Sequence, residues 1–366
     1  MQTLKVDLGN RSYFIRIGKG LCSEIIATRN AALKTGKKVA FFFDTGFRSA
    51  HSLFCDELSR GHPCMDLPSG ERTKSVANLE QVWDFLAQIK MDRGGVVFAV
   101  GGGVVGDLVG FAAGSFLRGI DFYQVPTTLL AMVDSSVGGK TGINLTAGKN
   151  LVGAFHQPSE VWADTEFLKL LPSREFSAGM AEVIKYGMLA DKSLYQKISG
   201  LSRPLGHESE ELVSIIKECC SIKASIVKDD EKETSINGKG RALLNLGHTF
   251  AHAFEAVAGY GTYLHGEAVA VGLVCALKLS KKMGLCPNDS EIELCDLLRS
   301  YNLPISFRAS LSLESLLEVM KSDKKVNRGK PRFIIMKEIG DAFQTDAIDQ
   351  NLVSEVLEEV GATTSG

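Results

Sequence analysis

Apolar and polar positions in the first half of the chain follow a strand-like period that helical patterns interrupt. Residues 4–17 (LKVDLGNRSYFIRI) alternate around a turn signal at Gly9-Asn10, which predicts a hairpin. Three further runs are typical of buried strands: residues 37–44, 94–100 and 122–128. Because strands that alternate with helices usually form a parallel sheet, we expect an α/β domain over residues 1–170.

Helical periodicity replaces the strand signal beyond Leu171. The segments that carry it are residues 208–228, 264–284 and 310–321. We therefore predict an α/β, Rossmann-like nucleotide-binding domain followed by an all-α domain over residues 171–366. The length of 366 residues agrees with two domains, since one domain typically has about 150 residues.

The composition is that of an ordinary globular chain and narrows the range of partners. With 45% hydrophobic residues, 23% charged residues and a net charge of -2, the chain has no basic excess for binding nucleic acid. The N-terminal stretch lacks the apolar core of a signal peptide, and the eight cysteines show no C-x-x-C spacing. We therefore expect a cytoplasmic protein with reduced thiols. Residues 94–117 carry one charge, but the glycines at 101–103 would break a membrane helix, so no membrane partner is expected.

The first candidate for chemistry is the glycine-rich turn after the strand at 94–100. It places Gly101, Gly103 and Gly106 in a G-x-G-x-x-G pattern that leads into a helix. Backbone N–H groups at such a helix N-terminus can bind a pyrophosphate. The polar loop at 68–75 (PSGERTKS) supports a phosphate-rich ligand. The alternative is a tight strand–helix connection without a ligand.

A second candidate is the segment 134–158, which combines five glycines with Lys140 and Lys149. Its apolar part, NLVGAF, indicates an ordered loop packed on the sheet rather than a flexible linker. Such a loop would hold Asp134, Lys140, Lys149 and Asn150 in place. Two lysines on a glycine scaffold suit a phosphorylated or carboxylated ligand, and a solvated loop is the alternative.

The third candidate is a polar stripe at residues 241–252: Arg241, Asn245, His248 and His252. If the segment is one helix, these side chains lie within an arc of about 60°. The other faces carry leucine and phenylalanine, and a solvated stripe would hold lysine and glutamate instead. The stripe therefore fits an internal site for an anion or a metal, with hydrogen-bonded structural histidines as the alternative.

A metal site at His248 and His252 would need further ligands. The pair is no zinc-protease motif, because a threonine and not a glutamate follows His248. The candidates are Glu182, which has Lys185 one turn further along, and His265 at the start of another helix. One carboxylate and two histidines with an open position are typical of a catalytic Zn²⁺ site. Spacing alone leaves open which two of the three histidines bind.

The long motifs of the chain occur in the order, and at nearly the spacing, of the 3-dehydroquinate synthase family of sugar-phosphate cyclases. They are GGGVVGDLVGF, LRGIDFYQVPTTLLAMVDSSVGGKTGIN, GKNLVGAFHQP, AGMAEVIKYG, RALLNLGHTFAHAFE and LHGEAVAVG. The chain resembles this family over residues 40–340. The resemblance implies an enzyme that uses NAD⁺ and one Zn²⁺ or Co²⁺ per subunit, with its active site in the cleft between the two domains.

The reaction implied by the resemblance converts 3-deoxy-D-arabino-heptulosonate 7-phosphate to 3-dehydroquinate and phosphate, the second step of the shikimate pathway. It proceeds by transient oxidation with NAD⁺, elimination of phosphate, re-reduction and intramolecular aldol closure. The expected partner is thus a small phosphorylated sugar acid. A second copy of the chain is also expected, because the resemblance brings Arg118 into the site from the other subunit of a homodimer.

The resemblance assigns further residues of this sequence to three groups. Glu182, His248 and His265 would bind the metal, with His252 on the substrate side. The residues expected at NAD⁺ are Asp44, Ser69, Gly70, Glu71, Lys74, Gly103, Val104, Val105, Gly106, Asp107, Thr127, Thr128, Asp134, Lys140, Lys149 and Phe167. Those expected at the substrate are Lys140, Asn150 and His252 for the phosphate, Lys185, Lys223, Arg241 and Asn245 on the carboxylate side, Asp134, and Lys324 or Lys325 as a cap.

Other activities on the same scaffold are the alternatives. Lys223 and Arg241 favour the dehydroquinate branch over sister cyclases of the 2-epi-5-epi-valiolone or 2-deoxy-scyllo-inosose synthase type, whose substrates lack the carboxylate. The chain departs from the family pattern at Ala251, in GSFLRG, and in a longer segment before Arg241. A metal-dependent polyol dehydrogenase would release NADH instead of recycling it. A non-catalytic nucleotide-binding relative is disfavoured because every candidate catalytic residue is present.

Overall fold

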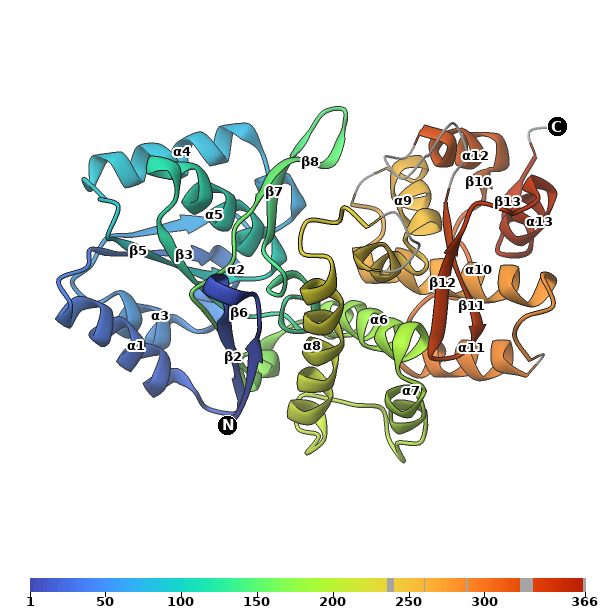
Figure 1. The fold of residues 1–366 in the computed structure, drawn as a ribbon, viewed down its shortest axis with the longest axis horizontal. Helices are drawn as coiled ribbons and strands as arrows, with labels where there is room; N and C mark the ends of the chain where they lie inside the picture. Colours follow the sequence, from blue (N-terminus) through green and yellow to red (C-terminus); the bar gives the residue numbers. More distant parts are fainter. Residues whose placement is uncertain (236–239, 260, 288, 323–331, 365–366) are drawn as a thin grey trace. The chain divides into compact units, whose positions relative to one another are not determined.

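The protein consists of two compact units in a computed structural model. The model describes residues 1–235, 240–259, 261–287, 289–322 and 332–364 (Figure 1). The N-terminal unit comprises residues 1–172 and 206–228, and the C-terminal unit comprises residues 173–205 and 229–366. The sequence predicted a single boundary near Leu171. The contacts group residues 206–228 with the N-terminal unit instead, because Lys223 and Cys220 there bond to Asp134 and Met132.

A seven-stranded sheet forms the centre of the N-terminal unit, in the order β1-β2-β9-β6-β5-β3-β4. Only β1 and β2 pair antiparallel, as the predicted hairpin, and the remaining pairs are parallel. The strands are β1 (Gln2–Val6), β2 (Tyr13–Gly18), β3 (Val39–Asp44), β4 (Cys64–Leu67), β5 (Val96–Gly101), β6 (Asp121–Pro126) and β9 (Glu160–Asp164). The predicted α/β architecture and its buried strands are confirmed.

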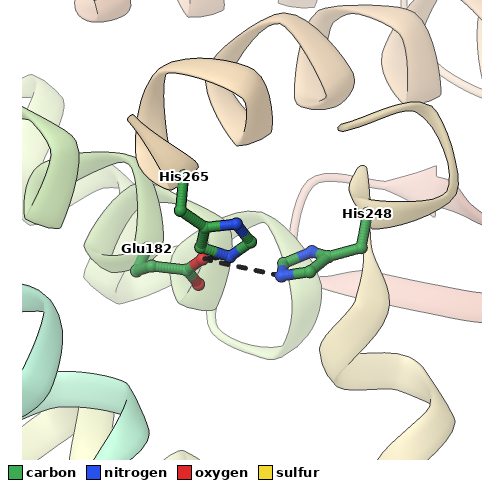
Figure 2. A group of neighbouring side chains, drawn as sticks. All are labelled: Glu182, His248 and His265. Atoms are coloured by element: carbon green, nitrogen blue, oxygen red, sulfur yellow. Dashed lines mark ion pairs between the residues drawn. The ribbon is translucent and has the colours of Figure 1, made fainter. Parts of the chain in front are cut away.

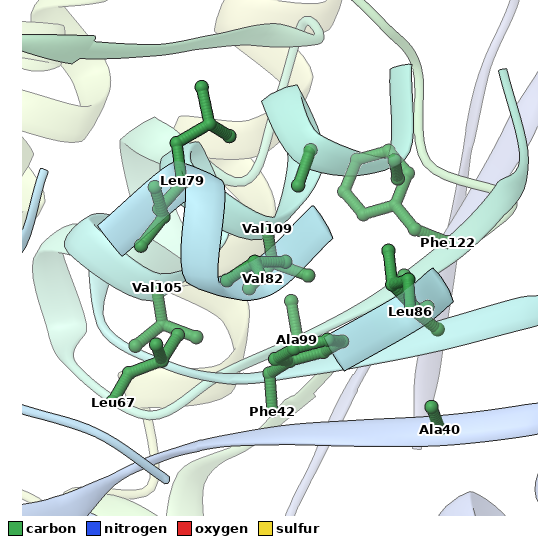
Figure 3. Close-up of a cluster of buried hydrophobic side chains, with 14 of the residues drawn as sticks. Ala40, Phe42, Leu67, Leu79, Val82, Leu86, Ala99, Val105, Val109 and Phe122 are labelled. Carbon is green, nitrogen blue, oxygen red and sulfur yellow. The ribbon is translucent and has the colours of Figure 1, made fainter. Parts of the chain in front are cut away.

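Helices cover both faces of this sheet, because alternate side chains of each strand point to opposite faces. Phe42 packs in one hydrophobic cluster, with α4 and α5, whereas Phe41 and Phe43 pack in another, on the side of α1 and α3. Figure 3 shows the first cluster, in which Val82 and Val105 lie near Phe42. The helices of the N-terminal unit are α1 (Cys22–Lys34), α2 (Thr45–Ala50), α3 (Ser52–Ser59), α4 (Val76–Gln88), α5 (Gly103–Ser115) and α8 (Leu212–Asp229), and α1, α3, α4 and α5 carry residues that pack in the two clusters.

The segment 134–158 differs from its predicted form as a loop. It contains the strands β7 (Lys140–Leu145) and β8 (Gly148–Phe155), which pair antiparallel as a hairpin. Gly142 and Gly153 are partners in this ladder, and a Cβ built on Gly153 would lie 2.0 Å from the carbonyl oxygen of Thr141. The glycines therefore allow the two strands to approach each other closely. Their number hid the strand pattern in the sequence, because glycine is rare in strands.

The C-terminal unit is mainly helical, as predicted, but also contains short strands. Its helices are α6 (Ser173–Ala190), α7 (Lys192–Ser199), α9 (His248–Val257), α10 (His265–Lys282), α11 (Ser290–Ser300), α12 (Leu313–Ser322) and α13 (Gln350–Glu359). The strands are β10 (Leu311–Ser312), β11 (Phe333–Glu338), β12 (Asp341–Thr345) and β13 (Ala362–Thr363), in two two-stranded sheets. Helix α10 is buried on all sides from Gly266 to Leu277, so it forms the core of this unit.

The structure bears on two expectations from the sequence: that residues 94–117 do not form a membrane helix, and that the cysteines are reduced. The apolar segment 94–117 forms β5 and α5 rather than one long helix. Among the described residues, no helix has the length and apolar character needed to cross a membrane. All eight cysteines are free thiols.

Candidate functional site

Three side chains distant in the sequence converge in the C-terminal unit (Figure 2). Glu182 lies in the middle of α6, and His248 and His265 are the first residues of α9 and α10. Their candidate ligand atoms all lie within 4.8 Å of one another. Nε2 of His248 and Nε2 of His265 lie 3.6 and 3.5 Å from Oε1 of Glu182. One carboxylate and two imidazoles are a donor set that fits Zn²⁺ or Co²⁺.

His252 lies beside this cluster but is not one of its members. Its ring centre is 5.7 Å from that of His248 and 6.4 Å from that of His265. Spacing had left open which two of the three histidines share a site with Glu182. The fold brings His248 and His265 to the carboxylate and leaves His252 next to them.

The polar stripe does not lie on one continuous helix, so this prediction was wrong. Arg241–Asn245 form a short 3₁₀ helix, η6, and α9 begins only at His248. Between them Gly247 has a left-handed backbone with φ of 77°. The break places the carbonyl oxygen of Leu246 3.1 Å from Nδ1 of His248, which leaves Nε2 to face Glu182.

Two glycines of α10 determine how closely the ligand-bearing segments approach one another. A Cβ on Gly266 would lie 1.9 Å from the carbonyl oxygen of Ala178, one turn before Glu182 on α6. A Cβ on Gly272 would lie 2.2 Å from the carbonyl oxygen of Gly247, next to His248. Sequence reasoning missed both positions. Helix α10 thus packs directly against the backbones that carry the other two ligands.

An ionic network around the buried carboxylate of Glu267 holds the first turn of α10. Glu267 accepts hydrogen bonds from Arg174 at 2.7 Å, from Arg308 at 2.6 Å and from the backbone N–H of Leu264 at 2.9 Å. Burial raises the pKa of Glu267, but these bonds outweigh it and lower the pKa to about 2. The carboxylate therefore stays charged at neutral pH and fixes the chain beside His265.

Lys185 and Glu182 form an ion pair on α6, and each side chain is only 1% exposed. Burial lowers the pKa of His265, but the carboxylates of Glu182 and Glu255 outweigh it and raise that pKa to about 10 in the metal-free chain. The cluster therefore carries excess negative charge that favours a cation, either a proton or a metal ion.

The glycine-rich turn of the N-terminal unit connects β5 to α5 as expected. The residue before α5 is Gly102, so no side chain caps the first turn of this helix. A Cβ on Gly103 would lie 2.9 Å from Ser135 Oγ, and one on Gly106 would lie 2.9 Å from Gln124 Oε1. The glycines thus allow α5 to pack closely, which a tight strand–helix connection without a ligand would also require. The N-terminus of α5 nevertheless keeps the geometry for binding an anion.

The 70–74 loop lies against α5 through a buried lysine. Lys74 Nζ lies 2.6 Å from Asp107 Oδ2, 2.5 Å from Asn150 Oδ1 and 3.7 Å from Glu71 Oε1. Burial lowers the pKa of Lys74, but Asp107 and Glu71 more than reverse this, so its pKa is raised. Lys74, Asp107 and Glu71, which were expected at the cofactor, therefore form one charged cluster. Asn150, which was expected at the substrate phosphate, lies in contact with this cluster.

The remaining residues expected at NAD⁺ differ in their surroundings. Asp44 caps α2 and accepts a hydrogen bond from Ser69 Oγ at 2.7 Å. Thr127 is buried after β6, and Thr128 is partly buried. Phe167, in η5 (Thr165–Leu170), packs in the hydrophobic cluster and is 3% exposed, which leaves its side chain little surface for a ligand.

The residues expected at the substrate are distributed over both units. In the N-terminal unit, Lys223 Nζ lies 2.9 Å from Asp134 Oδ1, Lys140 is exposed at the start of β7, and Lys149 is partly buried. Arg118 is exposed there, in η3 (Phe116–Arg118).

In the C-terminal unit, Arg241 is 1% exposed and donates to the carbonyl oxygen of Glu231 at 2.7 Å. Asn245 donates to the carbonyl oxygen of Ala242 at 3.2 Å. The predicted cap, Lys324 or Lys325, lies outside the described residues.

Comparison with known proteins shows one family over most of the chain. Family models described as 3-dehydroquinate synthase N-terminal and 3-dehydroquinate synthase C-terminal match residues 64–178 and 179–326. A 3-dehydroquinate synthase of Opitutus terrae is 50% identical over 361 residues, which are 99% of each chain. One of Methylacidiphilum infernorum is 45% identical over 361 residues, which are 98% of each chain.

Solved structures with the same fold include two sister cyclases. The structure of 2-deoxy-scyllo-inosose synthase complexed with carbaglucose-6-phosphate, NAD⁺ and Co²⁺ has a TM-score of 0.83 at 25% identity and covers 98% of this chain and 100% of its own. The 2-epi-5-epi-valiolone synthase of Streptomyces hygroscopicus, with NAD⁺ and Zn²⁺ bound, has a TM-score of 0.83 at 23% identity, over 95% of this chain and 96% of its own. The identity to curated relatives over nearly the whole chain decides the assignment: the chain belongs to the 3-dehydroquinate synthase family.

Proposed function

We propose that the chain converts 3-deoxy-D-arabino-heptulosonate 7-phosphate to 3-dehydroquinate and phosphate. The observation that carries this proposal is the cluster of Glu182, His248 and His265, in a chain 50% identical over 99% of its length to a 3-dehydroquinate synthase. The donor set suits a catalytic divalent ion, and the glycine-rich turn suits a dinucleotide. Both features agree with the NAD⁺ and Co²⁺ of the sister cyclase.

The two cofactors supply chemistry that amino-acid side chains lack. When bound, NAD⁺ accepts and returns a hydride, and the divalent ion acts as a Lewis acid. Glu182, His248 and His265 would hold the ion. The first turn of α5 would hold the pyrophosphate with its backbone N–H groups, and Lys74 would add positive charge beside it. The ion pair of Lys185 with Glu182 orients that carboxylate.

The charged groups of the substrate require cationic partners. We assign its phosphate to Lys140, Asn150 and His252, since lysine and histidine donate charge-assisted hydrogen bonds to phosphate oxygens. We assign its carboxylate side to Lys185, Lys223, Arg241 and Asn245. The contact of Lys223 with Asp134 supports this role, because it orients the ammonium group.

The decisive experiment supplies the substrate with a catalytic amount of NAD⁺ and follows phosphate together with the carbocyclic product. We expect many turnovers per NAD⁺, because the cofactor is oxidised and reduced within one cycle. Dialysis against a chelator should abolish phosphate release, and added Zn²⁺ or Co²⁺ should restore it. NADH accumulation with a polyol and no phosphate release would instead indicate a dehydrogenase. Turnover only of a sugar phosphate without a carboxylate would indicate a sister cyclase.

We also propose that the chain forms a homodimer, as expected from the role of Arg118. The β7–β8 hairpin projects from the N-terminal unit (Figure 1). It exposes four apolar side chains: Leu145 (39%), Leu151 (42%), Val152 (38%) and Phe155 (44%). Several exposed apolar side chains on one hairpin favour a surface that another protein covers. Sedimentation equilibrium at assay concentration should give twice the chain mass, and a monomer with full activity would contradict the dimer.

We further propose a cytoplasmic location for the protein. The eight free thiols support it, because cysteines usually stay reduced in that compartment.

A further inference from the structure

A buried carboxylate on α9, Glu255, has no part in the reaction proposed above. It lies two helical turns after His248, so both side chains are on the same face of α9. Only 3% of its side chain is exposed. An ionised carboxylate in such a position needs compensation, because burial of an uncompensated charge is strongly unfavourable.

Compensation for Glu255 comes at least in part from the ring of His265 on α10. Oε2 of Glu255 lies 3.5 Å from Nδ1 of His265, and Oε1 of Glu182 lies 3.5 Å from Nε2 of the same ring. The imidazole is therefore held between two carboxylates, one at each nitrogen. A nitrogen that donates its proton to a carboxylate is not available to a metal, so Glu255 directs Nε2 toward Glu182.

His248 is oriented in the same sense by a neutral acceptor. The carbonyl oxygen of Leu246 lies 3.1 Å from its Nδ1, and its Nε2 faces Glu182 at 3.6 Å. Both histidines thus present Nε2 to the cluster and have an oxygen acceptor behind Nδ1. Because the acceptor behind His265 is a carboxylate, it makes this imidazole the more basic ligand of the two.

Glu255 is not itself a member of the ligand cluster. The group whose candidate ligand atoms lie within 4.8 Å of one another consists of Glu182, His248 and His265. The oxygen of Glu255 faces Nδ1 of His265, which is the nitrogen directed away from Glu182. A role as a direct ligand would require the ring to turn, which would remove Nε2 from the cluster.

We propose that Glu255 is a positioning residue that fixes the tautomer and orientation of His265 and thereby strengthens metal binding. The proposal deepens the proposed function, since it rests on the same metal site. Helical spacing was the sequence signal for it: His248, His252 and Glu255 follow one face of α9 at intervals of four and three residues.

The test measures metal binding without substrate. Metal-free protein is titrated with Co²⁺, whose visible absorption reports both affinity and ligand geometry. We expect Glu255→Gln to weaken Co²⁺ binding about tenfold and Glu255→Ala to approach 100-fold, because the amide oxygen keeps an acceptor for Nδ1 whereas alanine removes it. We expect Glu255→Asp to lie between the native chain and Glu255→Ala, since it keeps the charge at a longer distance. Glu291→Gln is the matched control, because Glu291 is partly buried in the same unit and pairs with Lys278 and Lys281 rather than with a histidine of the cluster.

The outcomes separate positioning from general destabilisation. Melting temperatures of the metal-free variants identify any chain that has lost its fold. If Glu255→Ala unfolds, the Co²⁺ affinity of Glu255→Asp is compared with that of the native chain instead. Graded loss of Co²⁺ affinity with an altered spectrum, in variants that melt like the Glu291→Gln control, supports the proposal. Affinity within about twofold of native for both Glu255→Gln and Glu255→Ala overturns it. Failure of the native chain to release phosphate while it binds Co²⁺ would refute the proposed function and leave the role of Glu255 standing.

Discussion

Replacement of His248 by alanine is expected to abolish metal binding, whereas replacement of His252 by alanine leaves the metal bound and impairs turnover. His248 directs Nε2 at Glu182 from 3.6 Å, so its removal leaves Glu182 and His265 as the donors of this cluster among the described residues. We expect metal affinity to fall by more than the roughly 100-fold typical of a lost supporting contact. The metal content after gel filtration measures this directly.

The His252→Ala variant is the internal control for this experiment, because its ring lies beside the same cluster without joining it. Loss of one charge-assisted hydrogen bond to the substrate phosphate amounts to about 1.5–3 kcal/mol, so we expect turnover to fall by roughly one to two orders of magnitude. Equal loss of metal in both variants would show that the division of roles between the two histidines is wrong.

Replacement of Gly266 by alanine is expected to destabilise the C-terminal unit and to disrupt the metal site together. The added Cβ would lie 1.9 Å from the carbonyl oxygen of Ala178, and a backbone atom cannot rotate away. Overpacking of this kind costs about 1–3 kcal/mol or more, against a gain of about 1 kcal/mol in helix propensity. The displacement separates α10 from α6 and hence His265 from Glu182, so both the melting temperature and Co²⁺ affinity should fall.

Gly206→Ala is the matched control for Gly266→Ala, because a Cβ at Gly206 would meet no atom within 4 Å. We expect its melting temperature and Co²⁺ binding to remain native. Unchanged Co²⁺ affinity in Gly266→Ala would contradict the view that this close contact sets the spacing of the ligands.

The local sequence pattern was sufficient to predict those strands, helices and turns that depend on neighbouring residues alone. The run Phe41-Phe42-Phe43 indicated a buried strand, and the structure divides these rings between two faces of one parallel sheet. The same holds for the helix that begins at His265 and for the turn between β5 and α5. In each case periodicity or turn chemistry determines the element without distant contacts.

Predictions failed where a distant contact overrides the local pattern. The stripe at 241–252 has helical spacing, but Gly247 breaks it because that residue packs on Gly272 of another helix. The hairpin of β7 and β8 was not recognised, because its glycines suggest a loop until their pairing across the ladder is known. Residues 206–228 belong with the N-terminal unit through contacts to Asp134 and Met132, which no local pattern records.

By itself, the sequence determined the α/β and helical halves, the family, and a set of chemically suitable side chains that included Glu182, His248, His252 and His265. It could do so because periodicity, motif order and residue type are all local or serial properties. Only the tertiary structure decided which histidines share the carboxylate and that Glu255 lies behind one of them. Those relations depend on the distances between α6, α9 and α10. The close contacts of the α10 glycines with residues far away in the sequence determine these distances.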